Sequence, residues 1–124
     1  MPEIGHRRWA IAEGYIPGGS MSQERPFVSH ETVCLLNAGN QMASIKITVY
    51  FADRDPAGPY RFDLGARRTM HLRFNDLRDP EPVPRDTDYA SVIESSVPIV
   101  VQHTRLDSRH PNIALLSTIA YHQD

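Results

Sequence analysis

The feature that most constrains this chain is a segment in which apolar side chains recur at every second position. Within residues 44–51, Ile45, Ile47, Val49 and Phe51 alternate with serine, lysine, threonine and tyrosine. A period of two directs alternate side chains to opposite faces of an extended strand, and β-branched and aromatic residues favour sheets. The pattern predicts a β-strand with one face turned towards a core.

Further segments of this kind recur along the chain. Turn residues at 53–59 separate the first strand from an alternating segment at 60–64, and a second bend leads to another at 69–74. The remaining predicted strands are residues 9–16, 32–37, 99–106 and 114–121. The last of these also fits a helical period, but the polar turn before it and its Ser-Thr-Ile sequence favour a strand.

The spacing of these segments indicates the fold class. Seven or eight short strands roughly ten residues apart, with ten prolines and seven glycines concentrated in the turns, predict an all-β fold. We expect an antiparallel β-sandwich that is jelly-roll-like, with residues 76–88 as an ordered crossover loop held extended by alternate prolines. The 124 residues contain no repeat or linker, so we expect a single domain over residues 1–124.

Charge and hydropathy exclude several classes of function. The formal net charge of −2 is unlike that of a strongly basic nucleic-acid coat, so we do not expect a nucleic-acid partner. The N-terminal residues lack the apolar stretch of a signal peptide, and the apolar run at 97–101 is too short to cross a bilayer. We therefore expect a soluble, cytoplasmic protein without direct membrane insertion. Cys34 is the only cysteine, which excludes an intrachain disulfide, and its apolar surroundings predict a buried thiol.

Common catalytic signatures are missing from the sequence. It contains no Gly-x-Ser-x-Gly elbow, phosphate-binding glycine loop, His-Glu-x-x-His or Cys-x-x-Cys motif. We therefore expect neither an enzyme nor a cofactor, and assign no metal ligand. The alternative is a metal-dependent jelly-roll enzyme whose ligands come together only in three dimensions, from His30, Glu31, His71 and His103.

Polar residues gather at residues 29–32, 71–76 and 102–109. On a strand, His103, Arg105 and Asp107 point to one face, as do His71 and Arg73 on theirs. The clusters have two interpretations: structural pairing, for instance of the 103–107 face with Glu13, Glu31 or Asp88, or a shared polar pocket. Carboxylates, amides and guanidinium groups offer the donors and acceptors that a hydroxyl-rich ligand needs. The candidate pocket residues are Glu13, His30, Glu31, Arg73, Asn75, Asp88, His103, Arg105 and Asp107.

Long motifs spread over about residues 9–121 also resemble a known family. They are WAIAEGYIP (9–17), HETVC (30–34), LNAG (36–39), GPYR (58–61), ARRT (66–69), RFNDL (73–77), DTD (86–88), PIVVQHTRLDSR (98–109) and ALLSTIAY (114–121). On these residues the chain resembles the sensory rhodopsin transducer family. The resemblance implies a small β-sandwich that forms a cytoplasmic homotetramer, docks on the cytoplasmic face of a seven-helix retinal protein and relays its light state.

The resemblance leaves two functions open. One is the transducer, for which residues 53–58 and 76–88 are candidate contact loops, and whose tetramer would cover the outer face of the strand at 45–51. The other is a module that binds a small polar ligand such as a sugar and acts without a rhodopsin, as implied for relatives found where no rhodopsin is apparent. Both are binding functions rather than catalytic ones.

Overall fold

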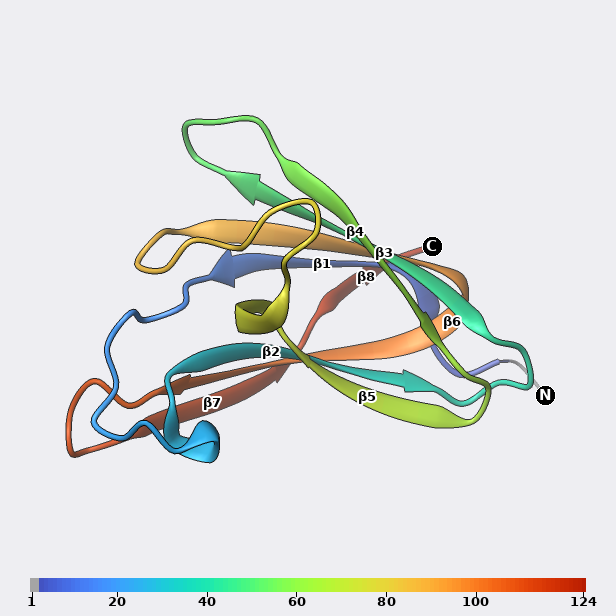
Figure 1. Cartoon of the computed structure of the whole chain (residues 1–124). Helices are drawn as coiled ribbons and strands as arrows, with labels where there is room; N and C mark the ends of the chain where they lie inside the picture. The colour runs from blue at the N-terminus through green and yellow to red at the C-terminus, as the bar shows by residue number, and fades with distance from the viewer. Residues whose placement is uncertain (1–2) are drawn as a thin grey trace.

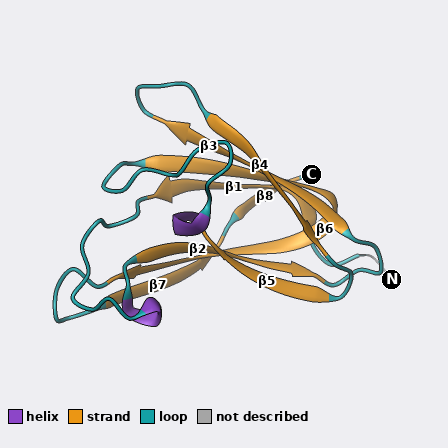
Figure 2. Ribbon diagram, in the orientation of Figure 1, coloured by secondary structure: helices purple, strands orange, loops and turns teal. Residues whose placement is uncertain are grey.

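The computed structural model describes residues 3–124, which form eight β-strands and two short 3₁₀ turns (Figures 1 and 2). The strands are β1 (His6–Gly14), β2 (His30–Asn37), β3 (Ala43–Phe51), β4 (Ala57–Leu64), β5 (Arg68–Arg73), β6 (Tyr89–Asp107), β7 (Ala114–Ile119) and β8 (Tyr121–Gln123). The turns are η1 (Arg25–Phe27) and η2 (Phe74–Asp76). Within the described residues, no helix has the length and apolar character needed to span a membrane.

The long strand β6 joins two layers. Its first half, residues 89–95, pairs with β1 and β3, and its second half, residues 100–107, pairs with β2 and β7. Layer A therefore has the order β4-β3-β6-β1-β8, and layer B the order β5-β2-β6-β7. Every pairing is antiparallel. Figure 1 shows the two layers facing each other and β6 passing between them. The predicted antiparallel β-sandwich is confirmed; its jelly-roll character stays a prediction.

The core lies between the layers and follows the alternation of each strand. On β3, Ile45, Ile47 and Val49 are at most 1% exposed, whereas Ser44 and Lys46 face solvent. Burial of each such side chain contributes about 1.5–3 kcal/mol. β3 thus covers its apolar face within one chain, and the covering of its outer face by a neighbouring subunit stays a prediction.

The first half of β6 is an element that the sequence pattern missed. Its inward positions include Ser91, a buried serine between the buried Tyr89 and Ile93, so the apolar alternation is interrupted. The strand expected at 69–74 also ends one residue early. Phe74 starts η2, whose turn is closed by the Leu77 amide donating to the Phe74 carbonyl at 3.2 Å.

The segment predicted as a single strand at 114–121 is divided at Ala120. This residue is buried, and its amide donates to the carbonyl of Val101 at 3.1 Å. β7 before it pairs with β6 in layer B, and β8 after it pairs with β1 in layer A. The chain therefore passes from layer B back to layer A at Ala120, beside the residues where β6 passes from layer A to layer B.

Candidate functional site

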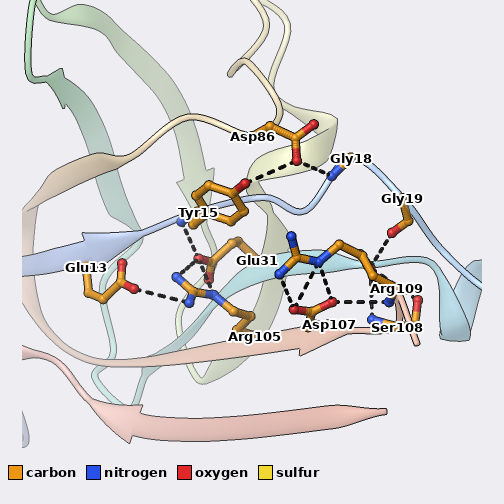
Figure 3. Close-up of polar contacts among 11 residues, drawn as sticks. Glu13, Tyr15, Gly18, Gly19, Glu31, Asp86, Arg105, Asp107, Ser108 and Arg109 are labelled. Atoms are coloured by element: carbon orange, nitrogen blue, oxygen red, sulfur yellow. Dashed lines mark hydrogen bonds and ion pairs between the residues drawn. The ribbon is translucent and has the colours of Figure 1, made fainter. Parts of the chain in front are cut away.

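A buried ion-pair network connects β2 with the second half of β6. The register places Glu31 opposite Arg105, and His103 on the same inward face two positions along β6. The Glu31 side chain has no exposed surface. Its Oε1 accepts from Arg105 Nε at 2.9 Å and Nη2 at 2.7 Å (Figure 3). Its Oε2 contacts His103 Nε2.

Neighbouring groups complete this network. The Tyr15 amide donates to Glu31 Oε1 at 2.6 Å, and Arg105 Nη1 donates to Glu13 at 3.1 Å. Asn75 joins from η2: its side-chain oxygen accepts from the Glu31 amide at 3.2 Å. Burial alone would lower the pKa of Arg105, but its hydrogen bonds to Glu13 and Glu31 raise it above the ordinary value. The guanidinium therefore stays charged, as a buried carboxylate requires.

Four of the nine predicted residues thus bond to one another through their ionisable side chains, and a fifth, Asn75, is attached through the Glu31 backbone. This is the structural pairing of Glu13 and Glu31 with His103 and Arg105 that the strand pattern allowed. Asn75 is also occupied, because its amide nitrogen donates to the Ser29 carbonyl at 3.0 Å. A network satisfied in this way specifies how the layers pack.

Beside the network lies Tyr89, which sequence reasoning did not single out because a tyrosine in a strand resembles any other core aromatic. Its ring packs against Phe74 with centroids 5.3 Å apart and fits against Gly14, where a Cβ would lie 2.5 Å from the tyrosine ring. Within residues 3–124 its buried hydroxyl has no hydrogen-bond partner. Burial raises the pKa of Tyr89, and the negative charge of Glu31 acts in the same direction.

The two remaining predicted carboxylates lie outside this network. Asp107 pairs locally with Arg109, with Nη2 and Oδ2 2.7 Å apart. Asp88 is exposed. Asp86, two residues earlier, instead ties this loop down by accepting from the Gly18 amide at 2.9 Å (Figure 3). A Cβ at Gly18 would lie 2.3 Å from the Asp86 carboxylate, so a larger residue there would displace this side chain.

His30 and Arg73 lie on the opposite, outer face of layer B. There they line a shallow groove of about 280 Å³ together with Thr32, Cys34, His71 and Thr104. The register places Arg73 opposite Thr32 and His71 opposite Cys34, which confirms that His71 and Arg73 share a face. Cys34, expected to be buried, is half-buried on this face because its position alternates with those of the inward residues of β2.

The groove has a basic character. Burial lowers the pKa of His30, and the positive charges of Arg73 and Arg25 act in the same direction against a backbone hydrogen bond at Val28. A second hollow of about 290 Å³ shares Arg73 and is lined by three further arginines, at 25, 78 and 85. Two larger hollows of about 520 Å³ each contain none of the nine predicted residues. The groove and its neighbour therefore suit neutral polar or anionic groups.

The alternative set of metal ligands is divided between the two faces of layer B. His30 and His71 line the outer groove, whereas Glu31 and His103 are buried on the inner face and bonded to each other. Because side chains on opposite faces of a sheet cannot share one ion, these four residues do not form a metal centre.

Comparisons with known proteins agree with the motifs. Residues 4–122 match the family model described as Anabaena sensory rhodopsin transducer. A solved structure named Anabaena sensory rhodopsin transducer is 60% identical and has a TM-score of 0.74, with the match covering 84% of this chain and 100% of that one. The crystal structure of Thermotoga maritima 1070 is 34% identical, with a TM-score of 0.86 and 97% of each chain covered. No curated protein matches.

Proposed function

Because the chain belongs to the Anabaena sensory rhodopsin transducer family, we propose that it is a transducer subunit that binds the cytoplasmic face of a seven-helix retinal protein and relays its light state. The observation that carries this proposal is the 60% identity to a transducer over 84% of the chain. We infer a single cytoplasmic domain over residues 1–124 that acts by binding and not by catalysis.

Relay by binding requires one light state of the receptor to bind the chain more tightly than the other. The difference in binding free energy is the signal, and a tenfold difference in affinity corresponds to about 1.4 kcal/mol. The two candidate contact loops are joined by an ion pair, with Arg54 Nη1 and Glu81 Oε1 2.8 Å apart. The loops at 53–58 and 76–88 therefore offer the receptor a combined surface.

The test is to measure the dissociation constant of the labelled chain for the retinal receptor of its own organism, held in lipid nanodiscs, in darkness and under illumination. We expect the two constants to differ by roughly fivefold or more. Arg54→Ala should reduce the difference, whereas Lys46→Ala, on the outer face of β3, should leave it unchanged. Equal constants in both light states contradict the relay, and so does the absence of any binding.

Self-association as a homotetramer is supported by β7. All six residues of this strand are exposed, and the large apolar side chains Leu115, Leu116 and Ile119 are 68%, 48% and 57% exposed. β7 pairs with β6 on one side and lies at the edge of layer B. An exposed apolar edge strand is a template for a second chain, so we assign the subunit contact to β7.

A second candidate function is the binding of a small polar ligand, and the outer groove favours it. The groove and the adjoining hollow meet at Arg73, whose Nη1 donates to the Arg25 carbonyl at 3.0 Å. We expect monosaccharides to shift the amide resonances of β2 and β5, and Arg73→Ala to abolish the shifts while Arg61→Ala, on β4, preserves them. Shifts that persist in Arg73→Ala, or a panel of sugars that gives none, contradict this candidate.

A further inference from the structure

Three potential metal ligands gather where β8 pairs with β1, away from the buried network and the groove. His6, His122 and Asp124 each offer one ligand atom, and these atoms all lie within 4.8 Å of one another. His6 belongs to β1, whereas His122 lies on β8 directly opposite Trp9. The group therefore bridges the first and the last strands of the chain.

The local structure explains why these side chains meet. His122 and Asp124 are two residues apart, a spacing that gives them the same face of an extended chain. The register of β1 against β6 shifts between His6 and Arg8, and the ring of His6 stacks on that of His122 at 3.6 Å between centroids. The His6 ring also contacts the Asp124 carboxylate.

The buried side chain of Trp9 packs beside this group of three residues. The buried Trp9 ring lies 5.8 Å from the His6 ring and 5.4 Å from the His122 ring. Its Nε1 donates to the carbonyls of His6 at 2.9 Å and of Ile99 at 3.1 Å. The core thus supports the two imidazole rings on one side, whereas the Asp124 side chain is 80% exposed.

We propose that His6, His122 and Asp124 bind a Zn²⁺ ion. Two imidazoles and a carboxylate form a donor set that suits zinc, and the large share of nitrogen ligands disfavours Mg²⁺ and Ca²⁺. Zinc bonds of about 2.0–2.2 Å place tetrahedral ligand atoms about 3.4 Å apart. The ion therefore draws the three atoms together and turns the two rings out of their stack, with a fourth position left for water.

The consequence of binding is a cross-link between β1 and β8. β8 pairs with β1 through only three residue pairs, and all three of its residues are exposed. A short exposed strand of this kind opens readily, because few buried contacts hold it. Zinc held by both strands favours the closed state, since the ion binds β8 only when it lies on β1.

The test is calorimetric titration of the untagged chain with zinc at pH 7.5. We expect one ion per chain and a loss of affinity of roughly tenfold or more in His6→Gln and in His122→Gln. His110→Gln, which changes an exposed histidine in the loop between β6 and β7, should leave the affinity unchanged. Binding should weaken at pH 5.5, because protonated imidazole cannot bind a metal ion. Circular dichroism of the metal-free variants shows whether they fold as the natural chain does.

A second measurement uses only the natural chain and does not depend on the folding of a variant. Zinc should shift the imidazole resonances of His6 and His122, leave those of His71 and His110 in place, and slow amide exchange in β8. The proposal is overturned if zinc does not bind, if it shifts the resonances of other histidines instead, or if folded His6→Gln and His122→Gln bind it as tightly as the natural chain does.

Discussion

At the scale of single residues, we expect the buried carboxylate of Glu31 to contribute strongly to the free energy of unfolding. Its buried carboxylate bonds to Arg105, His103 and the Tyr15 amide. Glu31→Gln keeps the shape but removes the charge, so the partly buried guanidinium loses its closest counter-ion. We expect the free energy of unfolding to fall by about 3 kcal/mol, because breaking a buried ion pair leaves a charge uncompensated. Urea unfolding at pH 7 and a fixed protein concentration measures this change.

Glu13→Gln is the matched control, since Glu13 contacts the same guanidinium from a side chain that is 70% exposed. Exposed ion pairs contribute little, so we expect a change below about 1 kcal/mol. Equal losses for the two variants would contradict the assignment of the network's stability to its buried member.

The sequence marked Glu13, Glu31, His103 and Arg105 and offered their pairing as one of two interpretations, but it could not decide between pairing and an open pocket. Glu31 and Arg105 are 74 residues apart, and only the β2–β6 register brings them opposite each other. The strand pattern marks His103 and Arg105 as candidates, because ionisable side chains in a row are unusual on a strand. The contribution of Tyr15 comes from its backbone amide, which carries no signal in the side-chain sequence.

At the scale of elements, the period of two predicts strands whose inward residues are all apolar. β3 meets that condition, whereas the first half of β6 does not, because Ser91 occupies an inward position. The division of the last predicted strand at Ala120 could not be predicted from alternation either, because it depends on which layer each neighbouring strand joins. Alternation thus predicts separate strands but not which layer of the sandwich each strand joins.

The contact between η1 and η2 predicts how the stability of the fold depends on pH. Arg25 Nη2 lies 2.8 Å from Asp76 Oδ2, and this hydrogen bond lowers the pKa of Asp76 below its ordinary value of 3.8, with Arg73 and Arg78 acting in the same direction. As the pH falls below 3.8, the unfolded chain takes up the proton first. The stabilisation is therefore present above that pH and is lost as the pH falls through the lower, folded value.

We expect the natural chain to be more stable than Asp76→Asn at pH 7, and this difference to shrink as the pH falls below 3.8. Urea unfolding at a series of pH values measures the difference. Asp63→Asn, an exposed aspartate on β4, provides the background from a surface carboxylate. A stability difference for Asp76→Asn that stays constant or grows towards low pH would show that the Arg25 contact does not stabilise the fold.

At the scale of the whole molecule, the exposed apolar side chains of β7 bear on whether the chain self-associates. The register places Leu115 opposite Leu106 and Ile119 opposite Gln102, so Leu115 and Ile119 share the outer face of layer B. Both side chains are more than half exposed in one chain, and a second chain would remove them from water. Paired chains would also satisfy the free edge of β7, which a monomer leaves to solvent.

We therefore expect light scattering to give a mass of about 56 kDa, four times the 14.0 kDa of one chain, and Leu115→Glu with Ile119→Glu to lower it. The two charges would have to be buried without partners, and that cost opposes association. Met42→Glu is the control, because Met42 is similarly exposed, at 56%, but lies in the β2–β3 loop. A natural chain with the mass of a monomer would refute the tetramer. A doubly substituted chain that keeps the full mass would instead refute the assignment to β7, because the subunits would then meet through another surface.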